Sequence, residues 1–221
     1  MHISRRLLIS VLGAAVGAPW ASGSVRAQGT LRRIPRPAQP RIEPIATETV
    51  DATQKAVDES APPRRQLRNI DRVMLNAPAA AKAFLVWGGY VLSSRNDLEP
   101  RQREIVILRT GYLCRAAYEW AQHIRIGERE GLTAEEVARI KIGSSSKSWS
   151  EADAILIRAC DELHADQCIS DATWAALRRR FTQKQCMDVV FTAGQYTQVS
   201  MMLNSFGVPL EAGQVADSDL K

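Results

Sequence analysis

The stretch Arg103–Arg129, REIVILRTGYLCRAAYEWAQHIRIGER, contains most of the acid–base and aromatic side chains that this chain could gather in one place. Residues four apart on an α-helix lie one above the other, so Glu119 and His123 share a face. A carboxylate so placed can orient an imidazole and set its charge, which makes the two a candidate proton-transfer pair. The same spacing is typical of a surface ion pair that contributes a few tenths of a kcal/mol. The spacing alone leaves both interpretations open.

Glu104 lies near the start of the same stretch, after Glu99-Pro100, a pair typical of a helix start. The helix dipole favours a carboxylate early in a helix, so this position alone could explain Glu104. It also adjoins an apolar stripe that begins at Ile105. Apolar surroundings raise the proton affinity of a carboxylate, as a general acid requires. Glu104 is therefore a second candidate acid–base group.

The run YEWAQH, preceded by REIVILRTGYL and followed by Gly127 and EGLTAEEVARI, resembles the carboxymuconolactone decarboxylase family of the alkylhydroperoxidase D-like superfamily. The resemblance extends from about Asn76 to Glu211. It implies an all-α fold, an alkylhydroperoxidase D-like helical bundle, which in this superfamily assembles as a homo-trimer or homo-hexamer. We expect the same oligomeric assembly here.

The peroxidase branch of that superfamily carries an upstream Glu followed by Cys-x-x-Cys-x-x-x-His. With His123 as the anchor, Glu104 matches the upstream Glu, whereas the two cysteine positions hold Ala116 and Glu119. Thiol redox chemistry needs a thiolate and a resolving thiol close together. Neither is present at these positions.

The decarboxylases that this sequence resembles remove carbon dioxide from a carboxylated unsaturated lactone without metal or organic cofactor, so the resemblance implies neither here. The electrons released form a dienolate that a proton must quench, which requires an oxyanion donor and a general acid. On that analogy His123 is the proton donor, Glu119 orients it and Glu104 is the second acid–base group. The expected substrate-binding side chains are Tyr118, Trp120 and Tyr196, with Tyr118 and Trp120 either forming an apolar wall or supporting the helix.

Three functions of different kinds remain open. The first is a cofactor-free lyase or isomerase acting on a small organic acid or lactone. The second is a peroxide-handling protein of the alkylhydroperoxidase or peroxiredoxin type that uses an unrecognised thiol, and the third is a non-catalytic helical oligomer that binds an apolar ligand. The cysteines Cys114, Cys160, Cys168 and Cys186 match no CxxC or zinc spacing. We expect buried thiols, with a Cys160–Cys168 bridge as the alternative.

The composition indicates one globular domain with extra length at its ends, since the 221 residues are 45% hydrophobic and 24% charged. The net charge is +5, but Arg5, Arg6 and Arg26 lie in a removable leader. Without them 26 basic residues face 24 acidic ones, which gives +2. This is no signature of nucleic-acid binding, so the expected partner is a small molecule.

Residues 1–27 have the form of a cleavable export signal, with a basic start, an apolar run from Leu7 to about Trp20 and small residues before Ala27. The adjacent Arg5 and Arg6, followed by Leu-Leu-Ile, resemble a twin-arginine signal, and an ordinary secretory leader is the alternative. The apolar run is too short to span a bilayer, so no membrane anchor is expected after cleavage. We expect a periplasmic or secreted protein. This location is at odds with the family's named substrate, which is normally handled in the cytoplasm.

The rest of the chain divides into a Pro/Arg-rich linker at 28–47, a helical domain at 48–211 and a loose tail at 212–221. After Thr47 no stretch alternates as a strand would, and several repeat at helical intervals. The helices are expected at 48–60, 69–75, 78–94, from Pro100, 133–142, from 149 or 150 to 164, from 170, and 182–206.

We expect the helix at 78–94 to be central in the bundle and its Gly88-Gly89 pair to pack closely against another helix. Gln195, Tyr196 and Asn204 are polar exceptions in the last helix that could face a pocket.

Overall fold

The computed structural model describes residues 34–49 and 67–220. The chain divides into two units, Met1–Ile34 and Pro35–Lys221, and every described helix belongs to the second. The expected export signal and most of the expected helix at 48–60 lie outside the described residues. Among the helices of the described ranges, none has both the length and the apolar character needed to cross a bilayer.

The described part of the chain is all-helical, as the sequence predicts. Its α-helices are α2 (Asn69–Met74), α3 (Pro78–Val91), α4 (Pro100–Leu113), α5 (Ala117–Arg129), α6 (Ala134–Ile142), α7 (Glu151–Asp166), α8 (Asp171–Arg180) and α9 (Gln183–Phe206), with 3-10 turns η1 (Thr47–Thr49) and η2 (Ser218–Leu220). Four of these helices begin where a hydroxyl side chain accepts a hydrogen bond from the backbone N–H three residues later, at Thr133, Ser150, Ser170 and Thr182. Each cap satisfies one of the N–H groups that a helix start leaves unpaired, which explains why these boundaries can be predicted from the sequence.

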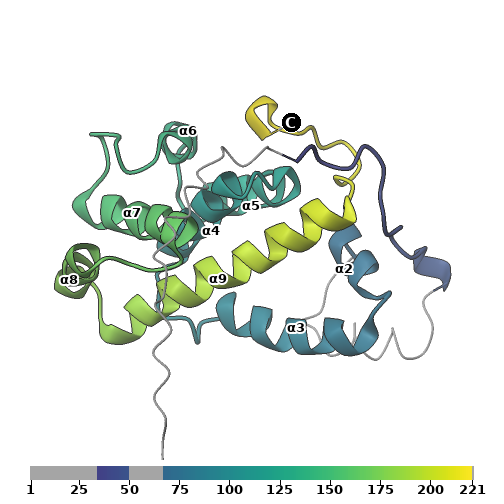
Figure 1. The fold of residues 1–221 in the computed structure, drawn as a ribbon, viewed down its shortest axis with the longest axis horizontal. Helices are drawn as coiled ribbons and strands as arrows, with labels where there is room; N and C mark the ends of the chain where they lie inside the picture. Colours follow the sequence, from purple (N-terminus) through teal and green to yellow (C-terminus); the bar gives the residue numbers. More distant parts are fainter. Residues whose placement is uncertain (1–33, 50–66, 221) are drawn as a thin grey trace, which may run out of the picture. The chain divides into compact units, whose positions relative to one another are not determined.

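Helix α4 is the centre of the bundle. It packs against α5, α6, α7 and α9, and all of its residues from Glu104 to Gly111 are buried. Helix α9 crosses the bundle with α4 and α5 on one side and α3 on the other (Figure 1). The main hydrophobic core joins α4 to α7, α8 and α9 through residues such as Ile105, Leu156, Leu177 and Val189.

Helix α3 is peripheral, so the expectation that it is central was wrong. Of its side chains only Ala81 and Val91 are buried, while Val86 is 70% exposed and Trp87 is 40% exposed. Its hydrophobic residues therefore lie on two faces of the helix, one packed against α9 and one exposed. Close packing holds for Gly88, where an added Cβ would lie 3.4 Å from Gln195 Nε2, but nothing lies within 4 Å of the corresponding point on Gly89.

The C-terminal segment packs on the helices instead of being loose. Leu220 is 2% exposed and joins the main core. Asp217 pairs with Lys141 at 2.6 Å between Oδ2 and Nζ, and accepts a hydrogen bond from Trp120 Nε1 at 3.1 Å. An apolar anchor and an ion pair thus fix a segment whose composition alone suggests solvent exposure.

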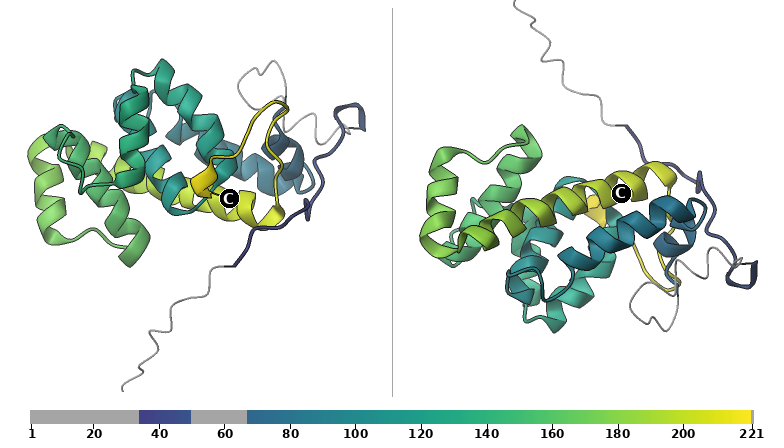
Figure 2. Two further views of the ribbon diagram at one scale, coloured as in Figure 1. Left: turned by 90° about the horizontal axis from the view of Figure 1, so that it is seen from above. Right: turned by 90° about the horizontal axis from the view of Figure 1, so that it is seen from below.

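Residues 35–46 form no helix, as the prolines predict, but they are fastened to the helices. The Arg41 N–H donates to Phe206 O at 2.7 Å, and Arg36 Nη2 donates to Cys114 O at 2.9 Å. Figure 2 shows this segment passing the C-terminal end of α9. Helix α9 ends at Gly207, whose φ is +69° and whose Cβ position lies 3.0 Å from Gln39 O, so a larger residue would be strained and crowded there.

Candidate functional site

His123 lies between two carboxylates that come from two helices. Its Nδ1 is 2.7 Å from Glu104 Oε2 on α4, and its Nε2 is 2.8 Å from Glu119 Oε1, one turn earlier on α5. The three residues are 2–4% exposed. The Glu119–His123 pair is therefore not a surface ion pair, and Glu104 contacts the imidazole instead of only stabilising a helix start.

The two carboxylates keep the imidazole protonated. Burial by itself lowers the pKa of His123, but the charges and hydrogen bonds of Glu119 and Glu104 outweigh burial and raise that pKa to about 9. At neutral pH both ring nitrogens carry a proton, and each donates to one carboxylate. The cluster thus holds a proton on a side chain that is 4% exposed.

Two glycines allow α4 and α5 to approach closely enough to form this cluster. A Cβ on Gly127 would lie 2.8 Å from Leu132 Cδ1 and 3.3 Å from Leu108 Cδ1. A Cβ on Gly111 would lie 3.4 Å from Glu119 Cγ. Any larger residue at Gly127 would have to displace the ends of the Leu132 and Leu108 side chains.

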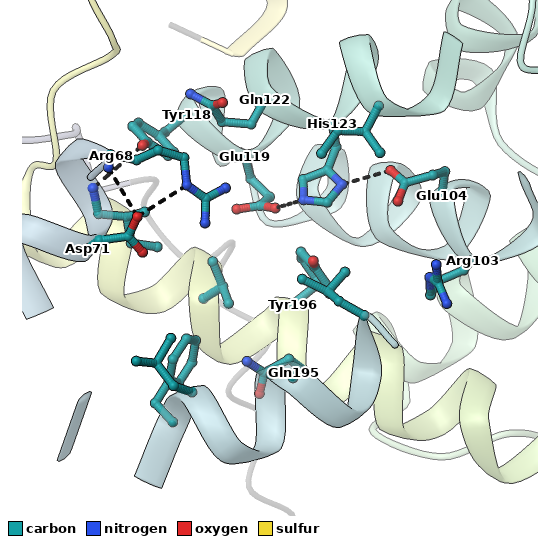
Figure 3. Close-up of a pocket in the computed structure, with 18 of the residues that line it drawn as sticks. Arg68, Asp71, Arg103, Glu104, Tyr118, Glu119, Gln122, His123, Gln195 and Tyr196 are labelled. Atoms are coloured by element: carbon teal, nitrogen blue, oxygen red, sulfur yellow. Dashed lines mark hydrogen bonds and ion pairs between the residues drawn. The ribbon is translucent and has the colours of Figure 1, made fainter. Parts of the chain in front are cut away.

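The cluster lies on the wall of a cavity of about 450 Å³ between α2, α3, α4, α5 and α9. Figure 3 shows Glu119, His123 and Glu104 in a row along this wall. The apolar part of the lining includes Ile70, Met74, Phe84, Leu85, Leu92 and Val199. The cavity therefore suits a small molecule with an apolar body that reaches the acid–base groups.

Two of the three expected substrate-binding residues line the cavity, Tyr118 and Tyr196. The Tyr196 ring meets the His123 ring edge to face, with centroids 5.0 Å apart. Burial raises the pKa of both tyrosines, so their hydroxyls stay neutral. Tyr118 Oη donates to Glu211 Oε1 and accepts from the Ile70 N–H at 3.5 Å, so its hydroxyl fastens α2 to the C-terminal segment.

Trp120 does not line the cavity, and its position fits the alternative expectation that it supports the helix. It is 1% exposed and packs in the main core, where its ring centroid lies 5.4 Å from that of Tyr112. One residue along an α-helix is a rotation of about 100°. The neighbour of Glu119 in sequence therefore points away from the wall that Glu119 forms.

Sequence reasoning missed the cationic part of the cavity. Arg68 and Arg103 both line it. Arg68 lies outside the quoted motifs, and Arg103 begins the run REIVILRTGYL but was given no role. Gln195, which the sequence marks as a polar residue in an apolar helix, also lines it. Its Oε1 is buried and has no hydrogen-bond partner among the residues that the structure describes. A buried acceptor without a partner is costly, so this atom calls for an explanation that the packing alone does not give.

The cysteines lie elsewhere. All four are free, and none lines the cavity. Cys160 and Cys186 are buried, but Cys114 is half-buried and Cys168 is exposed, so the expectation of four buried thiols holds for two. Burial raises the pKa of the Cys114 thiol, which disfavours the reactive thiolate. Within the described ranges, no group of three or more His, Cys, Asp or Glu residues is arranged to hold a metal ion.

Comparisons with known proteins agree with this architecture. Residues 78–156 match the model of the carboxymuconolactone decarboxylase family. No curated protein matches the sequence significantly. A solved structure of a protein of unknown function from Agrobacterium tumefaciens, proposed to be the antioxidant defence protein AhpD, is 20% identical with a TM-score of 0.59, covering 63% of this chain and 95% of that one.

A second solved structure is that of a cysteine-to-alanine variant of the debrominase Bmp8 in complex with 2,3,4-tribromopyrrole. It is 11% identical with a TM-score of 0.63, and the match covers 79% of this chain and 94% of that one. At such identities both likenesses concern the fold, which is the alkylhydroperoxidase D-like helical bundle.

Proposed function

We propose that this chain is a cofactor-free acid–base enzyme, a lyase or isomerase that acts on a small carboxylated lactone or organic acid. The match of residues 78–156 to the carboxymuconolactone decarboxylase family supports this proposal. The observation that carries the proposal is the position of His123, held between Glu104 and Glu119 on the wall of a cavity of about 450 Å³. A general acid needs a proton, a reason to keep it at neutral pH and access to the substrate. The cluster has all three.

The proposed reaction follows from these roles. When the bond to the carboxylate carbon breaks, carbon dioxide leaves and its electron pair passes to the carbonyl oxygen of the substrate as an enolate. His123 then supplies the proton that forms the new C–H bond. Glu119 and Glu104 stabilise the imidazolium before transfer, and the cluster regains a proton from water afterwards. In an isomerisation the same cluster would remove a proton from one carbon and return it to another.

An antioxidant function, as proposed for the Agrobacterium tumefaciens protein, is less well supported here in the form of thiol-dependent peroxide reduction. It requires a thiolate at the cavity, and Ala116 and Glu119 occupy the two positions where the peroxidase motif has cysteine. Cys114 contacts His164 with 3.8 Å between Sγ and Nδ1, but neither residue lines the cavity. A carboxylate at position 119 suits proton transfer and not thiol exchange.

The test is turnover in D₂O with a panel of unsaturated lactone carboxylates and small keto acids, followed by NMR for loss of carbon dioxide or incorporation of deuterium. We expect activity in the wild type and a loss of about 10²- to 10⁴-fold in His123→Ala, the usual contribution of general acid–base catalysis. His164→Ala is the matched control, since His164 is an exposed helix-borne histidine outside the cavity. Equal activity in His123→Ala and the wild type would contradict the proposal. Binding without turnover across the panel would favour the non-catalytic oligomer.

Export of the protein and assembly as a trimer or hexamer remain proposals. The export proposal rests on residues 1–27, and the assembly proposal rests on the resemblance to the superfamily and on exposed apolar side chains such as Val86 and Met201. Cell fractionation tests the first, and light scattering during size-exclusion chromatography tests the second. A cytoplasmic protein that elutes as a monomer would contradict both.

A further inference from the structure

Arg68 is a cation on the cavity wall that the acid–base mechanism does not use. We propose that Arg68 binds the carboxylate of the substrate, so that the cavity selects a monocarboxylate with an apolar body. This inference rests on the proposed function only in taking the cavity as the substrate site. It assigns a binding role to a residue outside the segment that matches the family model, residues 78–156.

The guanidinium of Arg68 has hydrogen-bond donors that its ion pair with Asp71 does not use. Its Nε donates to Asp71 Oδ2 at 3.3 Å, and its backbone N–H donates to the same oxygen at 3.1 Å. A guanidinium has five N–H donors, and this ion pair uses one of them. Its two terminal amino groups have no hydrogen-bond partner in the described part of the chain. The side chain is 39% exposed, so a ligand can reach these groups.

The direction of the side chain fits this role. Figure 3 shows the Arg68 guanidinium between Asp71 and Glu119, with its end in the cavity. The fork of two terminal amino groups matches the two oxygens of a carboxylate, a geometry that an ammonium group cannot reproduce. Burial lowers the pKa of Arg68, but the adjacent Asp71 outweighs it and raises the pKa overall, so the charge is permanent. Asp71 binds the Nε edge and holds the other edge toward the cavity.

Several hydrogen bonds fix the position of Arg68 relative to His123. Glu211 Oε1 accepts from the Asn69 N–H at 2.8 Å and from Tyr118 Oη, which joins the start of α2 to α5. Asn69 Nδ2 also donates to Leu210 O at 3.2 Å. A carboxylate bound by Arg68 would therefore lie at a defined place, next to the Glu119 end of the row formed by Glu119, His123 and Glu104.

The rest of the cavity fits the remainder of such a substrate. The space beyond Arg68 is bordered by Ile70, Phe84 and Val199, which suit an unsaturated or aromatic body. The unpartnered Oε1 of Gln195 is a buried acceptor at the cavity wall, and Gln195 is 4% exposed. A ligand that carries a carboxylate at one end and a hydroxyl or amide group elsewhere would satisfy both polar sites. The carboxylates of Glu104 and Glu119 would repel a second anionic group.

Benzoate and its uncharged isostere benzamide test this inference by NMR titration of the full chain at pH 7. We expect the wild type to bind benzoate more tightly than benzamide. In Arg68→Gln we expect benzoate affinity to fall by roughly 10- to 100-fold, the loss that goes with a charge-assisted hydrogen bond, and benzamide affinity to be unchanged. Arg68→Lys keeps the charge beside Asp71 but loses the fork, so it should lie between the two.

Arg125→Gln is the matched control, because Arg125 is an exposed residue of α5 that does not line the cavity. It removes the same charge and should bind benzoate like the wild type. Equal benzoate affinity in the wild type and in both Arg68 variants would overturn the inference, as would wild-type binding of benzamide as tight as that of benzoate. The readout is binding, so the inference stands if benzoate binds through Arg68 while the lactone and keto-acid panel shows no turnover. In that case only the proposed catalysis fails.

Discussion

Two groups of ionisable residues, each built around a buried member, differ in one respect. The His123 cluster (Glu104, Glu119 and His123) borders the cavity, whereas the Asp188 cluster (Tyr90, Asp97, Lys184 and Asp188) does not border it. Asp188 is 0% exposed and accepts hydrogen bonds from Tyr90 Oη at 2.6 Å, Lys184 Nζ at 2.6 Å and the Asp97 N–H at 2.8 Å. Asp188 is thus as buried and as fully paired as His123.

The comparison shows that a buried charge is not by itself a sign of catalysis. Asp188 joins α9 to α3 and to the segment before α4, and a backbone N–H is among its donors, so its charge has a structural role. The His123 cluster has an ionisable group between two carboxylates, and all three border a hollow space. What distinguishes a proton-transfer site is therefore access for a ligand, in addition to the shift in pKa.

The largest expected effect is on turnover, which should depend on the His123 cluster and not on the Asp188 cluster. Glu104→Gln leaves His123 with one carboxylate and weakens its hold on the proton. We expect turnover to fall by about 10²- to 10⁴-fold, as for loss of a general acid–base group. The measurement is kcat on a substrate identified from the panel. Tyr90→Phe in the Asp188 cluster is the control, and a comparable fall there would erase the distinction between the clusters.

The next effect is on the stability of the fold, to which the Asp188 cluster should contribute. Asp188→Ala leaves the Tyr90 hydroxyl and the Asp97 N–H without an acceptor and removes the partner of Lys184. We expect the free energy of unfolding to fall by about 3–5 kcal/mol, as when one partner of a buried pair is removed. Urea unfolding measures this loss. A fall below about 0.5 kcal/mol, the usual range for surface substitutions, would show that the cluster does not stabilise the fold.

The third effect is a pH dependence that belongs to the His123 cluster. The pKa of His123 is raised from 6.5 in the unfolded chain to about 9 in the folded protein. The folded state therefore binds this proton more tightly. Its contribution to stability is complete below pH 6.5, declines as the pH rises and is lost above about 9.

We expect a decline on the order of 3–4 kcal/mol across this range, since the pKa rises from 6.5 to about 9 and one pKa unit corresponds to about 1.4 kcal/mol. Urea unfolding at several pH values measures it, with His123→Gln as the control that lacks the titrating group. Equal slopes in the wild type and the control would mean that His123 is not held as an imidazolium.

The smallest effect concerns the side of α5 that faces away from the cavity. Trp120→Phe retains the aromatic packing but loses the hydrogen bond from Nε1 to Asp217. We expect a loss of about 1 kcal/mol in the free energy of unfolding, the usual net value of one such bond. The pKa of His123, measured by NMR titration, should not change. A changed pKa would show that Trp120 affects the His123 cluster.

Much of the fold follows from local sequence signals. The capping residues Thr133, Ser150, Ser170 and Thr182 place four helix starts, because a cap acts within one turn of the chain. The Glu119–His123 contact follows in the same way from helical spacing. Glu104 comes from another helix, and only the resemblance to a known family indicated that it belongs with His123.

What the sequence did not reveal depends on contacts between distant segments. Arg68 is separated from His123 by the whole of α3 and α4, and nothing local distinguishes it from other arginines. The peripheral place of α3 and the packed C-terminal segment have the same cause. Hydrophobic residues such as Trp87 are compatible with either a core or an exposed face, and only the packing of the other helices decides between them.

The hydrogen bonds that Glu211 accepts from Asn69 and Tyr118 have a consequence for the synthesis of the protein. While a nascent chain is still being translated, Glu211 is the last of these residues to leave the ribosome, long after α2 and α5 have emerged. The wall that carries Arg68 cannot be fastened until then. The bundle can begin to fold during translation, but its cavity acquires a fixed shape only after Glu211 has emerged.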